Sequence, residues 1–247
     1  MKKGLILGKG WLGQRLENKL NEKYDFTTTK RISDAENCIS IDFDQPISTT
    51  IQLDSFDFIL ILIPFGRRNS EEVLINRFNH ISELIKGFKK QILLISSTGI
   101  YPNFEMEIDE NSIPNEELIK PYSTIEKLMQ NHFPQLTILR LGGLMGDDRY
   151  LSKYINETSS NLNSVVNHIH YQDVIEIIHQ LIDKNITHQI YNITTSLKPS
   201  KQQVIAHQLN KKMNSNDTKK GKSISPKKII NELNYQFIYP NPIYFQD

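Results

Sequence analysis

Three glycines near the start of the chain have the clearest potential for chemistry, in the run Gly8-Lys9-Gly10-Trp11-Leu12-Gly13. An apolar stretch precedes them and leucines at helical spacing follow. In a strand–turn–helix unit, the first glycine permits the tight turn, the second leaves room for a pyrophosphate, and the third lets the helix pack closely on the strand. The N–H groups and the dipole of such a helix attract anions. The run therefore predicts a dinucleotide-phosphate site, with an ordinary glycine turn as the alternative.

Two cations follow the second expected strand, about 20 residues beyond the glycines, where a dinucleotide site contacts the adenosine ribose. An NAD-selective site would place a carboxylate there, whereas NADP requires positive charge for its 2′-phosphate. The strand end carries the cations Lys30 and Arg31 and no carboxylate, so the sequence favours NADP over NAD. Thr29 would be a further hydrogen-bond donor to the phosphate. Two solvated charges at a strand end are the alternative. Asp42 and Phe43 are placed to meet the adenine, or else form an ordinary turn.

The elements that must position these residues alternate between apolar strand-like runs and amphipathic helices. This pattern predicts an α/β fold with a Rossmann-type, doubly wound parallel sheet. We expect a dinucleotide-binding domain over residues 1–146 and a smaller substrate-binding portion over residues 147–247, with residues 190–193 returning to the sheet. The expected strands, short and mostly unalternated as in strands buried on both faces, are 5–7, 26–29, 38–41, 58–63, 92–96, 137–141 and 190–193.

Capping residues predict where several helices begin. Ser70, followed by two glutamates, predicts a long amphipathic helix. Ser200 and Gln203 form a capping box for another helix, and Ser225-Pro226 pairs an N-cap with a proline at the first helical position. Residues 214–223 predict a polar, lysine-rich loop that is either solvated or in contact with a phosphate-bearing ligand.

Composition excludes several classes of protein. The 247 residues carry 29 Lys and Arg against 28 Asp and Glu, and this balance gives no electrostatic case for nucleic acid or an anionic membrane. The single cysteine, Cys38, cannot form an internal disulfide, so we expect a small buried hydrophobe in a reducing cytoplasm. Polar residues interrupt the start that a signal peptide would need, and the apolar run 58–63 is too short to span a bilayer. We expect a cytoplasmic protein that binds a small molecule.

Several segments together resemble the extended and atypical short-chain dehydrogenase/reductases, which include NAD(P)-dependent nucleotide-sugar epimerases and dehydratases. The resemblance spans almost the whole chain. It implies a small hydroxylated or nucleotide-sugar-like substrate, and pairing of two copies through the helices around residues 74–85 and 126–133. The segments that carry it are the glycine run, Ser96-Ser97-Thr98-Gly99-Ile100-Tyr101, and residues 138–146, 167–174, 191–193 and 233–240.

The resemblance also implies roles for individual residues. Ser97 stands where the family's active-site hydroxyl binds the reacting group, and Thr98 and Tyr101 would border the substrate. His168 lies in a segment that lines the family's substrate cleft, before a helix led by Asp173. Together with the glycine run and the strand-end residues, the expected cofactor contacts are Gly8, Lys9, Gly10, Trp11, Leu12, Gly13, Thr29, Lys30, Arg31, Asp42, Phe43, Leu62, Ile63, Pro64 and Ser96.

One part of the family pattern is absent, because no tyrosine is followed by a lysine four residues later. In the family that lysine lowers the pKa of the phenol, so that the tyrosine can relay a proton near neutral pH. Aligning Glu126 with the family's following carboxylate places Tyr122 in the lysine position and Leu118 in the tyrosine position. Pro121 and a capping box over residues 123–126 predict that the helix starts after both. Glu126 is then a capping residue rather than a general base.

Other groups could replace the missing acid. Tyr122 is the phenol nearest in sequence, either as a catalytic group or as a helix-entry residue that packs on the sheet. Tyr101 is a second candidate. His168 and His170 share one face of an extended segment, but no further ligand pattern completes a metal set, so we expect no metal.

Three hypotheses follow from these residues. The favoured one is an NADP-dependent oxidoreductase, epimerase or dehydratase in which Ser97 orients the substrate and a phenol such as Tyr122, or water, replaces the usual proton relay. The alternative is a non-catalytic NADP(H)-binding sensor or regulatory module that acts through a partner. The third is a purely structural fold with an empty pocket.

Overall fold

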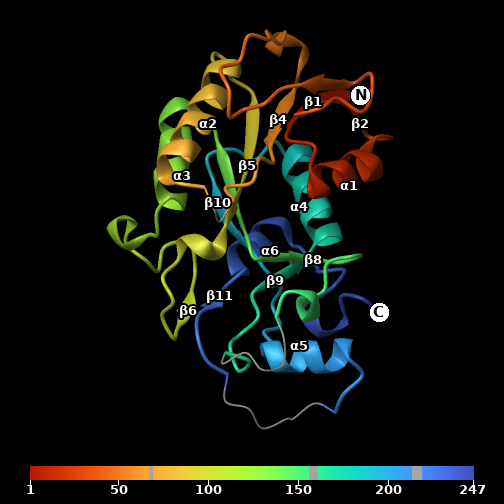
Figure 1. Ribbon diagram of the computed structural model, residues 1–247, viewed down its shortest axis with the longest axis vertical. Coiled ribbons are helices and arrows are strands. Elements are labelled where there is room, and N and C mark those ends of the chain that lie inside the picture. The colour runs from red at the N-terminus through yellow and green to blue at the C-terminus, as the bar shows by residue number, and fades with distance from the viewer. Residues whose placement is uncertain (67–68, 156–160, 213–218) are drawn as a thin grey trace. The chain divides into compact units, whose positions relative to one another are not determined.

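The computed structural model describes residues 1–66, 69–155, 161–212 and 219–247 (Figure 1). Its main feature is a seven-stranded sheet with flanking helices, which confirms the predicted Rossmann-type α/β fold. In chain order, the strands of this sheet are β1 (Lys2–Leu7), β2 (Tyr24–Lys30), β3 (Cys38–Ser40), β4 (Phe58–Ile61), β5 (Gln91–Ser97), β7 (Thr137–Leu141) and β10 (Ile190–Ile193). The helices are α1 (Trp11–Leu20), α2 (Glu71–Leu84), α3 (Tyr122–His132), α4 (Tyr171–Asp183), α5 (Lys201–Gln208) and α6 (Lys227–Leu233).

The strand order creates a point where the winding of the sheet reverses. The order is β10-β7-β5-β4-β1-β2-β3, so the chain moves from β1 to β3 in one direction and from β4 to β10 in the other. Right-handed crossovers then place α1 on one face and α2 with α3 on the other, as Figure 1 shows. β1 pairs in parallel with both β2 and β4. Ligands of such sheets bind beyond the carboxyl ends of the strands at this reversal.

The strands are apolar because both of their faces are covered. Leu5 and Leu7 of β1, with Ile59 and Ile61 of β4, belong to one buried cluster. An apolar stripe of α2 packs into the same cluster, and the helix starts as predicted, with the Ser70 side chain accepting from the Val73 N–H at 3.3 Å. This packing fixes the ends of β1 and β4, where the glycine run begins.

The chain divides into two compact units. The first contains Met1–Ile100, Leu118–Leu139 and His179–Ile190, and the second contains Tyr101–Glu117, Arg140–Ile178 and Tyr191–Asp247. The second unit has its own apolar cluster, around Leu151, Val166 and Val204. It also contains two small parallel pairs, β6 (Glu107–Ile108) with β11 (Ser223–Ile224), and β8 (Gly143–Met145) with β9 (His168–His170).

The start of α3 differs from the prediction. The helix begins at Tyr122, and Pro121 occupies the N-cap with helical backbone angles. A proline is tolerated there because the first N–H groups of a helix have no partner within the helix. The predicted capping box is wrong: the Ser123 hydroxyl donates to the Leu118 carbonyl at 3.2 Å, and Glu126 is buried. Tyr122 is therefore held on the helix itself.

The start of α6 also differs from the prediction. Pro226 is the N-cap of α6, without a side-chain hydrogen bond, and the Ser225 N–H donates to the Ile108 carbonyl at 2.8 Å. Ser225 therefore continues the β6–β11 pairing instead of capping the helix. The predicted loop at 214–223 ends in a strand, because Ser223 begins β11, and its residues 214–218 lie outside the described residues.

Two global expectations can be compared with the structure. Cys38 is buried in β3, as predicted. Within the described ranges, none of the helices combines the length and the apolar character that crossing a membrane requires.

Candidate functional site

The glycine run forms the predicted turn between β1 and α1. Gly8 has a φ of +96°, and a Cβ there would lie 2.6 Å from the Ile63 side chain. A Cβ at Gly13 would lie 2.9 Å from the Gly8 carbonyl oxygen. Gly10 is different, because a Cβ at this position would meet nothing within 4 Å. Gly10 is also the N-cap of α1, which has no side-chain cap and no acidic residue in its first turn. The start of this helix is therefore suited to an anion.

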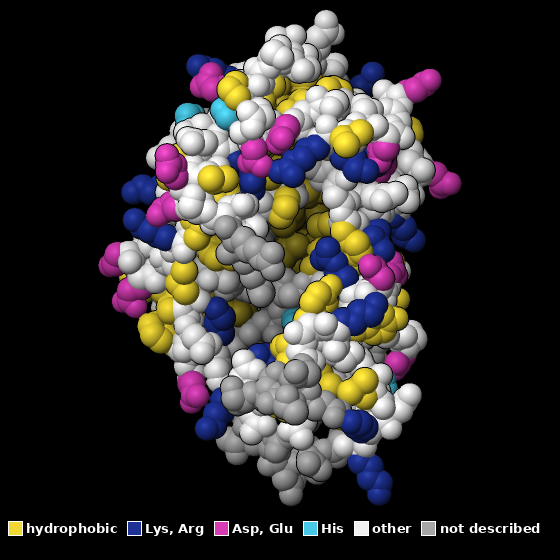
Figure 2. Space-filling view, viewed as in Figure 1, with side chains coloured by type: hydrophobic (Ala, Val, Ile, Leu, Met, Phe, Trp, Pro, Cys, Tyr) yellow, Lys and Arg dark blue, Asp and Glu magenta, His cyan; other side chains and the backbone are white. Residues whose placement is uncertain are grey.

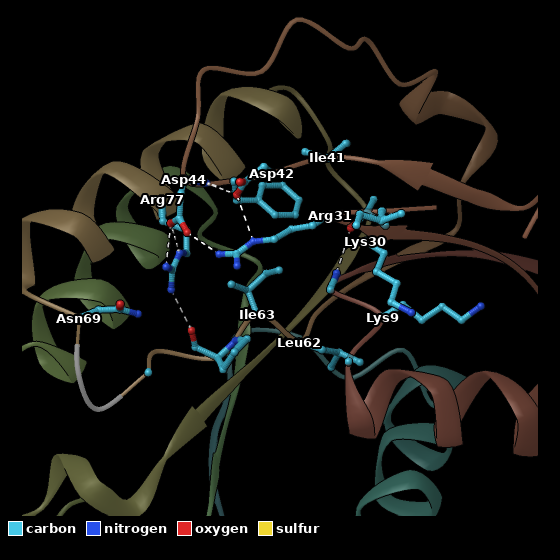
Figure 3. Close-up of a pocket in the computed structure, with 17 residues that line it drawn as sticks. Lys9, Lys30, Arg31, Ile41, Asp42, Asp44, Leu62, Ile63, Asn69 and Arg77 are labelled. Atoms are coloured by element: carbon cyan, nitrogen blue, oxygen red, sulfur yellow. Dashed lines mark hydrogen bonds and ion pairs between the residues drawn. The ribbon is translucent and has the colours of Figure 1, made fainter. Parts of the chain in front are cut away.

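A pocket of about 570 Å³ opens beside this turn, within the first unit (Figure 3). Its size is in the range of small-molecule and cofactor sites. The structure brings together these predicted cofactor residues in its lining: Gly8, Lys9, Gly10, Thr29, Lys30, Arg31, Asp42, Phe43, Leu62, Ile63 and Pro64. The lining residues that sequence reasoning missed are Ile32, Ile41, Asp44, Gly66, Asn69 and Arg77.

Four predicted cofactor residues do not line this pocket. Leu12 and Gly13 are buried on the packed side of α1. The ring of Trp11 has the Arg15 guanidinium 3.8 Å from its centroid. The hydroxyl of Ser96 donates to Glu126 at 2.5 Å in the interior. Leu12, Gly13 and Ser96 are thus packed in the interior instead of forming the pocket surface.

Thr29 supports the turn from β2. Its hydroxyl accepts from the Gly8 N–H at 3.0 Å, and its carbonyl accepts from the Lys9 N–H at 2.7 Å. The end of β2 thus fixes the backbone of the glycine run as well as carrying the two cations that follow it.

The predicted phosphate-binding cations form exposed ion pairs. Arg31 lies across the pocket in Figure 3, with Nη2 2.6 Å from Asp44 and Nε 3.3 Å from Asp42. The Arg31 side chain is 67% exposed. Lys30 lies 2.7 Å from Asp34, and hydrogen bonding to Lys30 is the main cause that lowers the pKa of Asp34 to about 2. Exposed pairs of this kind are weak, so an incoming phosphate can replace their carboxylates.

Arg77, on α2, lines the pocket with a side chain that is 8% exposed. Its Nε and Nη2 atoms both lie 2.7 Å from Asp44 Oδ1, and its Nη1 donates to the Pro64 carbonyl at 3.2 Å. The hydrogen bond from Arg77 is the main cause that lowers the pKa of Asp44. A sequence signal existed, because Arg77 stands between Leu74 and Ile81 in the apolar stripe of α2. A cation on that face needs a buried acceptor.

Two hydroxyl groups lie close to Gly99, just after the end of β5. A Cβ at Gly99 would lie 3.1 Å from Ser97 Oγ and 3.3 Å from the hydroxyl oxygen of Tyr122. Ser97 Oγ also accepts from the Gly99 N–H at 3.0 Å. The ring of Tyr122 packs on Phe65, with centroids 5.3 Å apart, next to the segment 62–64 that lines the pocket. The two predicted catalytic residues are therefore neighbours around Gly99.

The three residues predicted to contact the substrate lie in different surroundings. Thr98 is buried in a 3₁₀ turn after β5. Tyr101 is fully buried, its hydroxyl donating to Asn192 at 2.8 Å and accepting from Arg140 at 2.7 Å, and burial raises its pKa. Its side chain thus has no surface to offer a ligand in this structure. His168 is half-buried, and burial is the main cause that lowers its pKa to about 3.

In the parts of the chain that the structure describes, no group of three or more His, Cys, Asp or Glu side chains is placed to hold a metal ion. His170, the partner of His168 in the sequence pattern, instead packs its ring on Tyr239 with centroids 3.8 Å apart.

Comparisons with known proteins extend this picture. No protein-family profile matches the chain. Protein YeeZ of Escherichia coli strain K12 is 27% identical over 271 residues, covering 98% of both chains. A solved structure from Methylobacillus flagellatus, provisionally assigned as an NAD-dependent epimerase/dehydratase, has a TM-score of 0.78 at 19% identity and covers 99% of this chain and 96% of its own. Human epimerase family protein SDR39U1, solved with NADPH, has a TM-score of 0.74 at 15% identity, with 98% and 97% covered.

Proposed function

We propose that this chain, which has the fold of the epimerase/dehydratase-like short-chain dehydrogenase/reductases, binds a nicotinamide dinucleotide in the pocket beside Gly8 and Gly10. One observation carries the proposal: the side-chain position of Gly10 is open space at the uncapped start of α1. A pyrophosphate needs this combination of absent Cβ and available helix dipole. The NADPH in the human structure and the assigned NAD dependence of the Methylobacillus protein point to the same class of ligand.

The pocket residues fit the parts of such a dinucleotide. The Gly8–Gly10 turn would hold the pyrophosphate, Asp42 and Phe43 would meet the adenine, and the segment 62–64 would form the wall toward Phe65 and Tyr122. When bound, the nicotinamide ring supplies hydride transfer.

We further propose a preference for NADP over NAD. Lys30 and Arg31 both line the pocket, and the guanidinium of Arg31 can bind phosphate through two parallel hydrogen bonds. Phosphate would have to displace Asp44 and Asp42 from Arg31, and the 67% exposure of the Arg31 side chain makes that exchange inexpensive.

The proposed chemistry is that of a reductase, epimerase or dehydratase acting on a small hydroxylated or nucleotide-sugar-like compound. Ser97 and Tyr122 would contact the substrate, Ser97 orienting the reacting oxygen and the Tyr122 hydroxyl exchanging a proton with it. The support is their approach around Gly99 from β5 and α3. Tyr122 starts α3 with its ring held on Phe65, so the phenol is presented by fixed elements.

Cofactor binding is tested by the melting temperature of the protein with NADPH, NADP, NADH and NAD. A ligand at 100 times its Kd stabilises the native state by about 2.7 kcal/mol, which raises the melting temperature by several degrees. NADPH and NADP should give the larger shifts. No shift with any of the four would refute the proposal.

Substitution of Gly10 tests the site itself. Because Gly10 has ordinary extended backbone angles and open space around its Cβ position, Gly10→Val should fold as the wild type does and lose the ligand-induced shift. Gly10→Ala is the matched control, with a smaller loss. Full retention of binding by Gly10→Val would move the site elsewhere.

Turnover separates the enzyme from the second candidate function, a non-catalytic NADP(H) sensor. The sensor is favoured by one observation, the absence of the family's tyrosine–lysine pair at Leu118 and Tyr122. For the enzyme, Ser97→Ala and Tyr122→Phe should each abolish hydride exchange on a panel of hydroxylated and nucleotide-sugar substrates while leaving the cofactor-induced shift intact. Binding without turnover on the whole panel would favour the sensor.

A further inference from the structure

Arg77 connects two separate walls of the pocket. One wall includes Asp44, which comes after β3, and the other includes Pro64, which comes after β4. The guanidinium contacts Asp44 with two nitrogens at 2.7 Å and the Pro64 carbonyl with its third at 3.2 Å. Figure 3 shows the Arg77 side chain beside Asp44, with dashed lines between the two. All three nitrogens of this side chain are thus used inside the pocket wall.

Arg77 and Arg31 share the carboxylate of Asp44 but differ in the oxygen that they bind and in the exposure of their side chains. Arg77 binds Asp44 Oδ1 and its side chain is 8% exposed, whereas Arg31 binds Oδ2 and its side chain is 67% exposed. A buried arginine with a fixed set of acceptors is costly to move, because its charge would lose its partner in a region with little water. The exposed arginine can rotate away at little cost.

We propose that Arg77 is a positioning residue for the dinucleotide site: it sets the separation of the Asp42–Asp44 wall from the 62–64 wall. This inference rests on the proposed function. The two walls would contact parts of the ligand that NADP and NAD share, the adenine on one side and the middle of the molecule on the other. Arg77 should therefore act on both dinucleotides equally, while Arg31 acts on the 2′-phosphate alone.

The test compares Kd values for NADPH and NADH, measured by calorimetry, in the wild type, Arg77→Met, Arg77→Lys and Arg31→Met. Arg77→Met should raise both Kd values at least about tenfold, with their ratio unchanged within a factor of two. Arg77→Lys should fall in between, because a lysine keeps the charge beside Asp44 but has no planar fork to reach Pro64 as well. Arg31→Met should raise the Kd for NADPH at least about tenfold and leave that for NADH unchanged.

The outcomes separate this inference from the proposed function. If the wild type binds neither dinucleotide, the proposed function fails. If the wild type binds and both Arg77 variants bind as tightly, or if Arg77→Met changes the ratio as Arg31→Met does, the positioning role is overturned and the function stands. Circular dichroism reports whether Arg77→Met folds. If it does not fold, Arg77→Lys decides: the positioning role requires that this variant raise the Kd values for NADPH and NADH by the same factor.

Discussion

Two buried ionisable groups, one in each unit, are stabilised in opposite ways. In the first unit, Arg77 keeps its charge and is matched by the carboxylate of Asp44, whose pKa it lowers. In the second unit, burial outweighs the nearby Asp147 carboxylate and lowers the pKa of His170 to about 4, so the ring stays neutral at pH 7. The stability that a paired charge contributes depends on its partner, whereas the stability that a buried neutral group contributes depends on the pH of the solution. The difference predicts which unit responds first to acid.

The C-terminal segment of the second unit is attached at two neighbouring points. His170 packs on Tyr239, and Asp173 accepts from the Tyr235 hydroxyl at 2.8 Å, the Ile238 N–H at 2.7 Å and the Tyr239 N–H at 3.1 Å. Asp173 is fully buried, and burial raises its pKa in spite of these bonds. The carboxyl group thus replaces water for three donors of one segment.

The largest effect is expected from Asp173→Asn, which keeps the size of the side chain. An amide has one acceptor oxygen in place of two, so its NH2 group would face a donor and leave buried hydrogen bonds unmade. We expect a loss of about 3 kcal/mol in the free energy of unfolding, measured by urea denaturation. Tyr235→Phe removes one donor only, and should cost about 1 kcal/mol. A cost below about 0.5 kcal/mol for Asp173→Asn would show that the carboxylate does not hold the segment.

Acid titration tests the neutral histidine of the second unit. The unfolded chain binds a proton at His170 near pH 6.5, whereas the folded chain does so only near pH 4. Stability should therefore fall as the pH is lowered from about 6.5 to about 4, and this one group should account for about 2 kcal/mol by pH 5.

His170→Phe keeps an aromatic ring against Tyr239 and removes the titration. Its stability should fall less than that of the wild type between pH 7 and pH 5, by about 2 kcal/mol. The pKa of Asp44 is lowered, so its ionised carboxylate stops contributing to the free energy of unfolding only at more acidic pH. Parallel curves for the wild type and His170→Phe would remove the distinction between the two units.

Short-range patterns in the sequence predicted the fold well. Residues close together in the sequence determine the seven sheet strands, the glycine turn and the caps at Ser70 and Ser200. Most of the pocket lining could be predicted as well. The carboxyl ends of parallel strands meet at one edge of the sheet, so residues that directly follow predicted strands come together there.

Long-range contacts explain what the sequence did not reveal. Arg77 and Asp44 are 33 residues apart, and the carboxylate of Glu126 binds Ser96 from 30 residues away. Local rules assigned Glu126 to a capping box, but a buried hydroxyl offered a better partner. Tyr101 was placed beside a substrate by resemblance, yet Arg140 and Asn192 engage its hydroxyl in the interior. Partners of buried polar groups are decided by the tertiary structure.

The smallest effect on stability is expected from Arg31→Met, and it sharpens the contrast between charge that holds structure and charge that is available to a ligand. The Arg31 guanidinium makes two ion pairs, but at 67% exposure water and salt screen them, so the free energy of unfolding should change by about 0.5 kcal/mol or less. Asp44 keeps its buried partner Arg77, so no charge is left stranded. Urea denaturation of Arg31→Met without ligand measures this change. A loss above about 1 kcal/mol would mean that Arg31 is a structural partner of Asp44 and is not free to exchange it for a phosphate.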